Sequence, residues 1–205
     1  MGSENKQKMS LCILPAVDTL KKGKLVVYPT ETLYGLGAVA FDERAVKKVF
    51  EAKQRPLTEP ISIAVNGLEM VRKVARVNMV ALKLYDAFLP GPLTLILKAE
   101  KGLSNLLVKG GKIGVRVPFH PIALKLITGV GAPLTSTSAN LHGGQDPISL
   151  DIAKMQLGNR VSLYIEGGVL GGLPSTVVEL TSDKPKVLRE SIISKEDILR
   201  VTNNG

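Results

Sequence analysis

Polar side chains that could bind a small ligand follow the first predicted strand of the chain. The segment PTETLYGLG at residues 29–37 combines the hydroxyls of Thr30 and Tyr34 with two glycines that let the backbone approach a ligand closely. The same composition also suits a turn in which Thr and Glu side chains cap the neighbouring elements. Residues 29–37 are therefore a candidate ligand loop, with a structural turn as the alternative.

Cations that could bind an anion lie in three other segments. Lys53 and Arg55 follow a predicted helix and could hold phosphate groups, although the helix dipole alone also favours cations at a helix C-terminus. Arg116 lies in the apolar segment IGVRV, where a buried guanidinium needs either an anionic ligand or an internal carboxylate. Arg189 follows in the segment KVLRE. A shared anionic ligand would bring all four cations into one site.

Neutral donors and acceptors form two further clusters. Ser136, Ser138 and Asn140 stand in the segment PLTSTSAN, and Ser175 follows the glycine-rich segment GGVLGGLP. Hydroxyl and amide groups can orient a nucleotide without requiring a counter-charge. The alternatives are an ordinary turn in the first cluster and a hairpin shaped by glycines in the second.

Several familiar catalytic motifs are absent from the sequence. It has no GxxxxGKS/T phosphate loop, no GxGxxG dinucleotide loop, no GxSxG nucleophile motif and no HExxH zinc motif. His120 and His142 are the only histidines and Cys12 is the only cysteine, which excludes a His-built zinc centre and an internal disulfide. We expect a protein of a reducing compartment, the cytoplasm, in which any metal arrives with a ligand.

The elements that must position these residues alternate between strand and helix, which is typical of an α/β domain. Apolar runs predict strands at residues 24–28, 61–65, 93–99, 113–117, 162–166 and 175–180. Apolar spacing of three and four and capping residues predict helices at residues 42–54, 68–76, 78–88 and 120–128, with a last helix opened by Ser194. Residues 29–38 are predicted to be loop, and residues 133–140 to begin extended.

Length and composition favour one domain over residues 1–205. We expect its sheet to be mixed, because adjacent strands near both ends of the chain can pair antiparallel. Residues 1–10 are polar and are expected to form a flexible leader, and no secretory or membrane-spanning segment is present. Hydrophobic residues make up 44% of the chain, enough for a full core. Lys and Arg number 27 against 18 Asp and Glu, so the net charge of +9 favours polyanionic partners such as nucleotides or RNA.

Taken in order, the clusters resemble the YrdC-like family of threonylcarbamoyl-AMP synthases. The matching segments are PTETLYGLG, KQRP, LPGPLT, VRVP, SAN, LPSTVV and VLR, which run from about residue 20 to residue 190. The resemblance implies a twisted mixed α/β sheet with a large concave basic face. It also implies a nucleotidyltransferase that converts L-threonine, bicarbonate and ATP into threonylcarbamoyl-AMP, pyrophosphate and water, for N6-threonylcarbamoyladenosine formation in tRNA.

The resemblance assigns roles to individual residues. The catalytic and phosphate-binding residues would be Lys53 and Arg55, and the other ATP-binding residues would be Ser138, Asn140 and Arg189. The residues around L-threonine would be Thr30, Tyr34, Ser136 and Ser175, with Arg116 paired to the threonine carboxylate. Mg²⁺ would arrive with ATP. The expected partners are tRNA or double-stranded RNA and the downstream tRNA threonylcarbamoyl transferase machinery, with no membrane.

The sequence departs from the family pattern at four positions. Ala64 stands where many members carry histidine, Thr137 replaces a proline, Asp146 replaces a serine near ATP, and Ser191 replaces a glycine. We leave Asp146 out of the site, and we expect no additional C-terminal domain of the kind that longer members carry. The alternative function is a non-catalytic module of the same fold that binds double-stranded RNA or tRNA. The net charge favours it, whereas only 4% aromatic residues argue against stacking on single strands.

Overall fold

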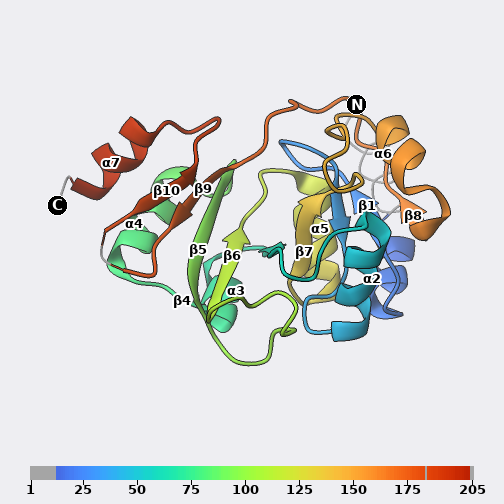
Figure 1. Ribbon diagram of the computed structural model, residues 1–205, viewed down its shortest axis with the longest axis horizontal. Coiled ribbons are helices and arrows are strands. Elements are labelled where there is room, and N and C mark those ends of the chain that lie inside the picture. The colour runs from blue at the N-terminus through green and yellow to red at the C-terminus, as the bar shows by residue number, and fades with distance from the viewer. Residues whose placement is uncertain (1–12, 183, 204–205) are drawn as a thin grey trace.

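The structure is a computed structural model that describes residues 13–182 and 184–203 of the chain. Within those residues ten strands form one twisted mixed sheet in the order β10-β9-β5-β6-β3-β7-β2-β1-β8, with β4 paired to β5 (Figure 1). The strands are β1 (Val26–Tyr28), β2 (Gly35–Gly37), β3 (Ser62–Ala64), β4 (Ala75–Arg76), β5 (Leu93–Ala99), β6 (Lys112–Arg116), β7 (Leu134–Ser138), β8 (Leu163–Tyr164), β9 (Thr176–Glu179) and β10 (Lys186–Arg189).

The helices cover the sheet and its two ends. Residues 13–21 are helical, and the labelled helices are α2 (Glu43–Lys53), α3 (Leu68–Val74), α4 (Met79–Phe88), α5 (Pro121–Val130), α6 (Leu150–Leu157) and α7 (Lys195–Asn203). In Figure 1, α2 and α6 lie at the end of the sheet formed by β1 and β8, and α4 and α7 lie at the end formed by β9 and β10.

The centre of the sheet sets which side chains share one face. Strand β3 pairs in parallel with β6 and antiparallel with β7, so that Ile63 lies opposite Val115 on one side and Thr135 on the other. Ser62 lies opposite Ser136 in the same register. Because side chains alternate along a strand, these pairings place the apolar residues on one face and the two serines on the other.

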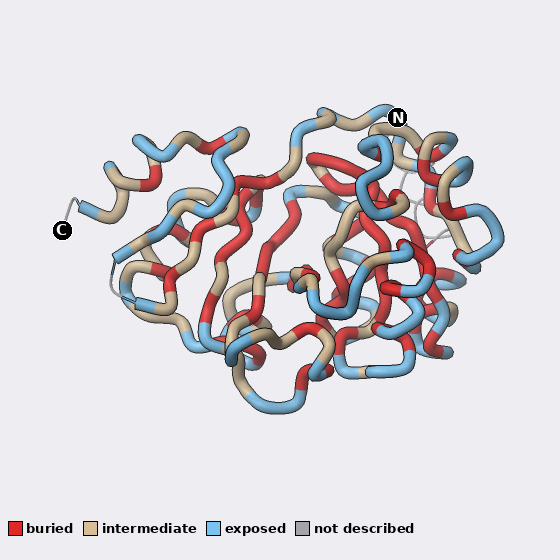
Figure 2. The backbone as a smooth tube through the Cα atoms, viewed as in Figure 1, coloured by how far each residue is buried: buried red, intermediate tan, exposed pale blue. Residues whose placement is uncertain are grey.

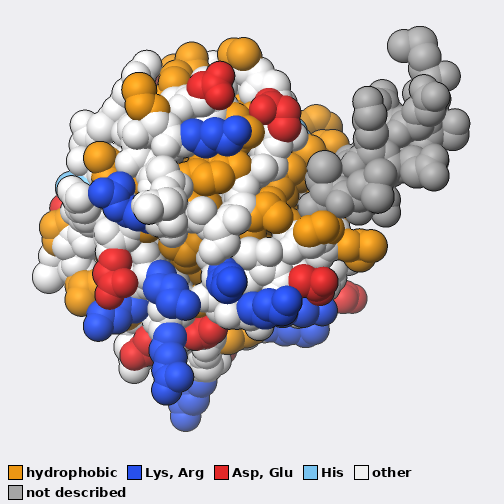
Figure 3. All heavy atoms as spheres, turned by 90° about the vertical axis from the view of Figure 1, so that its right-hand side faces the viewer, with side chains coloured by type: hydrophobic (Ala, Val, Ile, Leu, Met, Phe, Trp, Pro, Cys, Tyr) orange, Lys and Arg blue, Asp and Glu red, His pale blue; other side chains and the backbone are white. Residues whose placement is uncertain are grey.

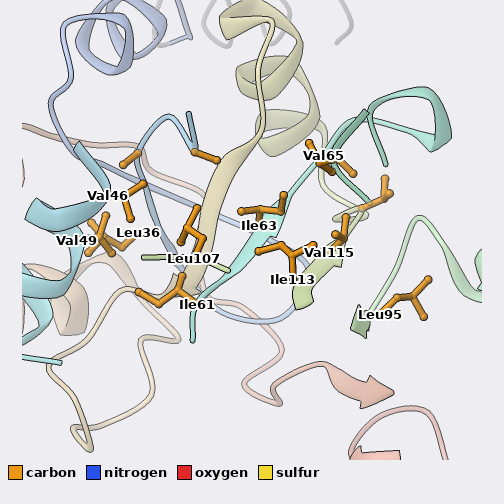
Figure 4. Packing of buried hydrophobic residues seen from close by; sticks show 14 of the residues in the cluster. Leu36, Val46, Val49, Ile61, Ile63, Val65, Leu95, Leu107, Ile113 and Val115 are labelled. Carbon is orange, nitrogen blue, oxygen red and sulfur yellow. The ribbon is translucent and has the colours of Figure 1, made fainter. Parts of the chain in front are cut away.

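Two clusters of buried hydrophobic residues pack on the sheet. The larger one joins α2 to the central strands, and Figure 4 shows Val46 and Val49 of α2 beside Leu36 of β2. The second joins the helix at residues 13–21 and α5 to β1 through residues such as Leu20, Leu126 and Val26. Figure 2 shows the buried backbone concentrated along these central strands. The site described below therefore lies on a rigid, well-packed sheet.

Helix α2 illustrates how local sequence sets an element that bears on the site. The Asp42 side chain accepts a hydrogen bond from the backbone N–H of Ala45 and so caps the first turn. The helix ends at Lys53, and the capping residue Gln54 adopts the left-handed conformation at φ 52°. Beyond this turn the two cations have different contacts. Lys53 binds Ser138 and Asn140, whereas Arg55 binds the carbonyl of Pro60.

Most predicted elements are confirmed, including the helix at residues 42–54 and the strand at residues 93–99. The predicted loop at residues 29–38 is wrong in part, because β2 pairs with both β1 and β7. Helix α5 also continues past Gly129 to Val130, and the capping residue Gly131 has the left-handed φ of 75°. The helix at residues 13–21 and the elements α6, β4 and β10 are not among the predicted elements.

The twisted mixed α/β sheet confirms the predicted fold class. The predicted leader at residues 1–10 and Cys12 lie outside the described residues. None of the helices within residues 13–182 and 184–203 combines the length and the apolar character needed to cross a membrane.

Candidate active site

A cavity of about 300 Å³ opens on the serine-bearing face of the central strands. Its walls come from the 30–35 segment, the turn after α2, strands β3, β5, β6 and β7, and the segment before β9. All but two of the predicted site residues line it: Thr30, Tyr34, Arg55, Arg116, Ser136, Ser138, Ser175 and Arg189. The exceptions are Lys53 and Asn140. The fold therefore gathers segments more than 150 residues apart in sequence around one space.

Small side chains form the floor of the cavity. A Cβ atom on Gly114 would lie within 2.4 Å of the Ser62 hydroxyl oxygen, so only glycine allows Ser62 to occupy that place. The hydroxyls of Thr94 and Ser175 are 2.8 Å apart and hydrogen-bond to each other. The Ser62 hydroxyl makes no hydrogen bond within the described part of the chain and is open to the cavity.

Arg116 has an internal partner. Its Nη2 lies 2.5 Å from Glu31 Oε1, and the other carboxylate oxygen of Glu31 accepts the backbone N–H of Phe119 at 3.1 Å. Nη1 and Nη2 both lie 3.3 Å from the Thr32 hydroxyl. The Nε atom of Arg116 is buried and has no partner. The internal carboxylate that the sequence allowed is therefore present, and it leaves part of the guanidinium unsatisfied.

Arg189 and Arg55 both line the cavity and are held by backbone carbonyl groups. Arg189 donates from Nε and Nη2 to the carbonyl oxygen of Ser175 at 3.0 and 2.8 Å. Burial, and the positive charge of Arg116 nearby, lower the pKa of Arg189. Arg55 donates to the carbonyl of Pro60 at 3.2 Å and pairs with Glu59 at 3.2 Å. Guanidinium groups that repel one another across a cavity favour an anion between them.

Lys53 and Asn140 lie behind the cavity wall. Lys53 is 1% exposed, and its Nζ donates to Ser138 O at 2.5 Å, Asn140 O at 2.8 Å and Asn140 Oδ1 at 2.9 Å. Burial and then the charge of Arg55 lower the pKa of Lys53 from 10.5 to about 7. Asn140 Oδ1 also accepts the Ser138 hydroxyl at 2.7 Å. The four predicted site residues of the KQR and SAN segments thus fall into two pairs: Arg55 and Ser138 line the cavity, and Lys53 and Asn140 lie behind its wall.

The hydroxyls of Thr30 and Tyr34 are occupied within the protein. Thr30 donates to the carbonyl of Leu33 at 2.7 Å and accepts two backbone N–H groups. Tyr34 donates to the carbonyl of Gly168 at 2.8 Å and accepts the N–H of Gly167 at 2.9 Å. Burial raises the pKa of Tyr34 to about 12. Both side chains shape the cavity, and their roles toward a ligand stay predictions.

Several lining residues were not in the predicted site. Asp146 lines the cavity with the three arginines, although the family pattern had led us to leave it out. The only sequence signal for Ser62 and Thr94 is that each is a polar residue inside a predicted apolar strand. Ala64, where many family members carry histidine, is fully buried in the second core cluster and contributes no polar group.

The oxygen donors of the cavity are not arranged as a metal cage. Within residues 13–182 and 184–203, no group of three or more His, Cys, Asp or Glu side chains is placed to hold a metal ion. Asp146 and the serine and threonine hydroxyls are oxygen ligands of the type that Mg²⁺ accepts alongside substrate phosphates. The residues present therefore fit a magnesium ion that is bound mainly by phosphate groups.

Comparison with known proteins assigns the chain to a family. The family model named for Sua5, YciO and YrdC, with the description "Telomere recombination", matches residues 18–191. A putative threonylcarbamoyl-AMP synthase of Methanocaldococcus jannaschii is 38% identical over 179 residues, which are 87% of this chain and 84% of that protein. The threonylcarbamoyl-AMP synthase of Pyrococcus abyssi is 39% identical over 189 residues, but the chain spans only 56% of its length.

Solved structures give the same result. The crystal structure of P. abyssi Sua5 complexed with L-threonine superposes with a TM-score of 0.89 at 38% identity, covering 92% of this chain and 56% of that chain. The crystal structure of Escherichia coli YciO superposes with a TM-score of 0.85 at 35% identity, covering 93% of this chain and 94% of that one.

Proposed function

Because the chain belongs to the Sua5/YciO/YrdC family, we propose that it is an L-threonylcarbamoyladenylate synthase. The reaction joins L-threonine, bicarbonate and ATP into threonylcarbamoyl-AMP with release of pyrophosphate and water. One observation carries the proposal: Arg55, Arg116 and Arg189 line a single cavity whose floor is made of hydroxyl groups. Such a lining suits a ligand with a triphosphate and a carboxylate, and relatives of this chain carry the corresponding name.

The cations divide naturally between the two substrates. Arg55 and Arg189 would bind the ATP phosphates, because guanidinium groups form paired hydrogen bonds with phosphate oxygens. Arg116 would bind the L-threonine carboxylate, with Ser136 and Ser175 beside it. The homologous Sua5 of P. abyssi was crystallised with L-threonine, which supports this choice of amino acid.

The proposed reaction needs orientation and charge neutralisation more than a covalent nucleophile. The threonine amine attacks bicarbonate, loses water and becomes a carbamate. A carbamate oxygen then attacks the α-phosphorus of ATP, and the bond from that phosphorus to the bridging oxygen of the leaving pyrophosphate breaks. Holding both substrates in one cavity makes these steps effectively unimolecular, and the arginines stabilise the charge that develops on the phosphates.

Magnesium belongs to the proposal as a companion of ATP. When bound to the phosphates, the ion would neutralise part of their charge and so help pyrophosphate to leave. Asp146 is the carboxylate of the cavity lining that could meet it.

The decisive test of the activity is pyrophosphate release by the purified chain with ATP, Mg²⁺, bicarbonate and L-threonine. We expect release to depend on both threonine and bicarbonate, and threonylcarbamoyl-AMP to appear in equal amount. ATP turnover that is unchanged when threonine is omitted would contradict the proposal. Serine should be a poorer substrate, because a pocket shaped for the threonine methyl group loses about 1–3 kcal/mol without it.

We propose a cytoplasmic setting in which the product passes to a tRNA threonylcarbamoyl transferase. The second candidate function, binding of tRNA or double-stranded RNA, draws support from the net charge of +9 and from the Lys and Arg side chains along the lower part of the face in Figure 3. Binding of this kind should weaken steeply with salt and show little sequence preference, because phosphate contacts release counterions. A titration at several salt concentrations checks this, and a salt-independent complex would contradict it.

A further inference from the structure

Lys53 ends helix α2, and its side chain makes all of its hydrogen bonds with one short segment, residues 138–140. Its Nζ donates to Ser138 O, Asn140 O and Asn140 Oδ1, while its own carbonyl oxygen accepts the backbone N–H of His142 at 2.8 Å. The protonated Lys53 side chain has three N–H donors and the neutral side chain has two, and the three acceptors satisfy them in either form. No donor of Lys53 remains for a phosphate, and the residue does not line the cavity.

Asn140 transmits this restraint to Ser138. Its amide nitrogen donates to the carbonyl of Gly144 at 2.9 Å, which fixes the orientation of the amide group. Its Oδ1 atom, which Lys53 binds, accepts the hydroxyl proton of Ser138 at 2.7 Å. With its proton directed at Asn140, the Ser138 hydroxyl can only accept a hydrogen bond from a ligand in the cavity.

We infer that Lys53 is a positioning residue that acts through Asn140 to present the Ser138 hydroxyl to the nucleotide as a hydrogen-bond acceptor. This inference rests on the proposed function. The α- and β-phosphates of ATP carry no proton at neutral pH and the γ-phosphate is mostly deprotonated, so we expect Ser138 to meet an N–H of the base or an O–H of the ribose. The phosphates are left to Arg55 and Arg189, which do line the cavity.

The first measurement uses the protein without ligand. We expect the backbone amides of Ala139 and His142, which donate to Tyr34 O and Lys53 O, to exchange hydrogen at least about tenfold faster in Lys53→Met. The matched control is Lys48→Met, because Lys48 lies on the same helix and donates to the carbonyl of Gly23, away from the cavity. Unchanged exchange at both amides in Lys53→Met would overturn the inference.

The second measurement separates positioning from phosphate binding. Lys53→Met and Ser138→Ala should each weaken ATP binding about threefold to tenfold, and the double variant should be no weaker than either single one. Affinity for inorganic tripolyphosphate should stay within about twofold in Lys53→Met but fall about tenfold or more in Arg55→Ala. Additive losses for ATP, or a loss of tripolyphosphate affinity as large as that of Arg55→Ala, would overturn the inference.

A substitute variant and a wild-type control complete the experiment. If Lys53→Met does not fold, Asn140→Ala replaces it in both measurements, since it removes the shared acceptor and leaves the lysine its two carbonyl partners. Wild-type protein that binds neither ATP nor tripolyphosphate would contradict the proposed function, and the exchange measurement would then decide the role of Lys53.

Discussion

The Glu31 carboxylate lies 2.5 Å from the Arg116 guanidinium, and the two side chains are only 15% and 9% exposed. The protein therefore already supplies an anion to the cation that is proposed to bind the substrate carboxylate, although Glu31 itself is not among the residues that line the cavity. A threonine carboxylate must either share Arg116 with Glu31 or displace Glu31 from Arg116. The Nε atom of Arg116 has no partner and is buried. A small movement of the Arg116 side chain would let Nε bind the threonine carboxylate while Nη2 stays paired with Glu31.

Glu31→Gln tests this relationship. The substitution keeps the size of the side chain but leaves Arg116 without its counter-charge, so the free energy of unfolding should fall by about 2–4 kcal/mol. L-threonine should then stabilise the variant more than it stabilises the wild-type protein, because its carboxylate supplies the missing charge. Thermal unfolding with and without L-threonine measures both effects.

The control for that prediction is Glu100→Gln. Glu100 pairs with Arg76 at 3.0 Å, but the side chains are 39% and 71% exposed, so its loss should cost less than about 1 kcal/mol. A Glu31→Gln variant as stable as this control, with no added response to threonine, would show that the buried pair has no part in ligand binding.

The lowered pKa of Lys53 predicts a pH dependence of stability. Below about pH 7 the lysine is charged in both states, and between about 7 and 10.5 only the unfolded chain keeps the proton. The unfolded state then binds more protons, so the free energy of unfolding rises with pH over this window, by about 1.4 kcal/mol for each pKa unit of the shift. Burial is the main cause, and Arg55 lowers the pKa further while Asp146 partly opposes both.

Denaturant unfolding of wild-type protein and Lys53→Met from pH 6 to pH 10.5 measures that contribution. We expect the stability of the wild-type protein relative to the variant to be constant near pH 6 and to increase above pH 7. A difference that stays flat up to pH 10 would show that Lys53 keeps an ordinary pKa. Lys48→Met, which removes an exposed lysine, should follow the wild-type curve throughout.

Arg189→Ala should separate ligand binding from stability. Removing a charge-assisted contact to phosphate should weaken ATP binding by about 1.5–3 kcal/mol, or roughly tenfold to a hundredfold. The melting temperature should change little, because loss of the contacts to Ser175 is offset by relief of repulsion with Arg116. Calorimetric titration measures the ATP affinity of the variant, and thermal unfolding of the same sample measures its melting temperature. An unchanged ATP affinity would show that Arg189 does not bind ATP.

Sequence alone could predict elements that depend on local signals. Asp42 and the apolar spacing of α2 are enough to place that helix, and Ser149 with Leu150, Ala153 and Leu157 is a similar local signal for α6. Strand β2 could not be predicted in this way. It is three residues long with two glycines, and it forms because β1 and β7 lie on either side of it.

The candidate site could be predicted as a set of residue types but not as a geometry. Arg116 on β6 and Arg189 on β10 come together because β10 pairs antiparallel with β9, β9 pairs in parallel with β5, and β5 pairs antiparallel with β6, which no local pattern reveals. The separate positions of Lys53 and Arg55 depend on the left-handed turn at Gln54. Two cations separated by one residue in the sequence thus have different contacts.

The last prediction concerns the floor of the cavity. Gly114→Ala would place a methyl group 2.4 Å from the Ser62 hydroxyl oxygen and 3.4 Å from the Thr94 methyl group. Ser62 would have to move into the cavity, which should lower the free energy of unfolding by about 1–3 kcal/mol and weaken binding of ATP or L-threonine. Thermal unfolding and titration with each ligand measure the two effects.

A second substitution identifies the cause. Ser62→Ala in the Gly114→Ala background removes the hydroxyl oxygen and leaves the nearest remaining Ser62 atom at 3.1 Å, so it should restore most of the lost stability and binding. Gly67→Ala is the matched control, because a Cβ there meets nothing within 4 Å. If Gly114→Ala binds both ligands as the wild type does, or if the double variant is no better than the single one, then contact between residues 62 and 114 does not shape the site.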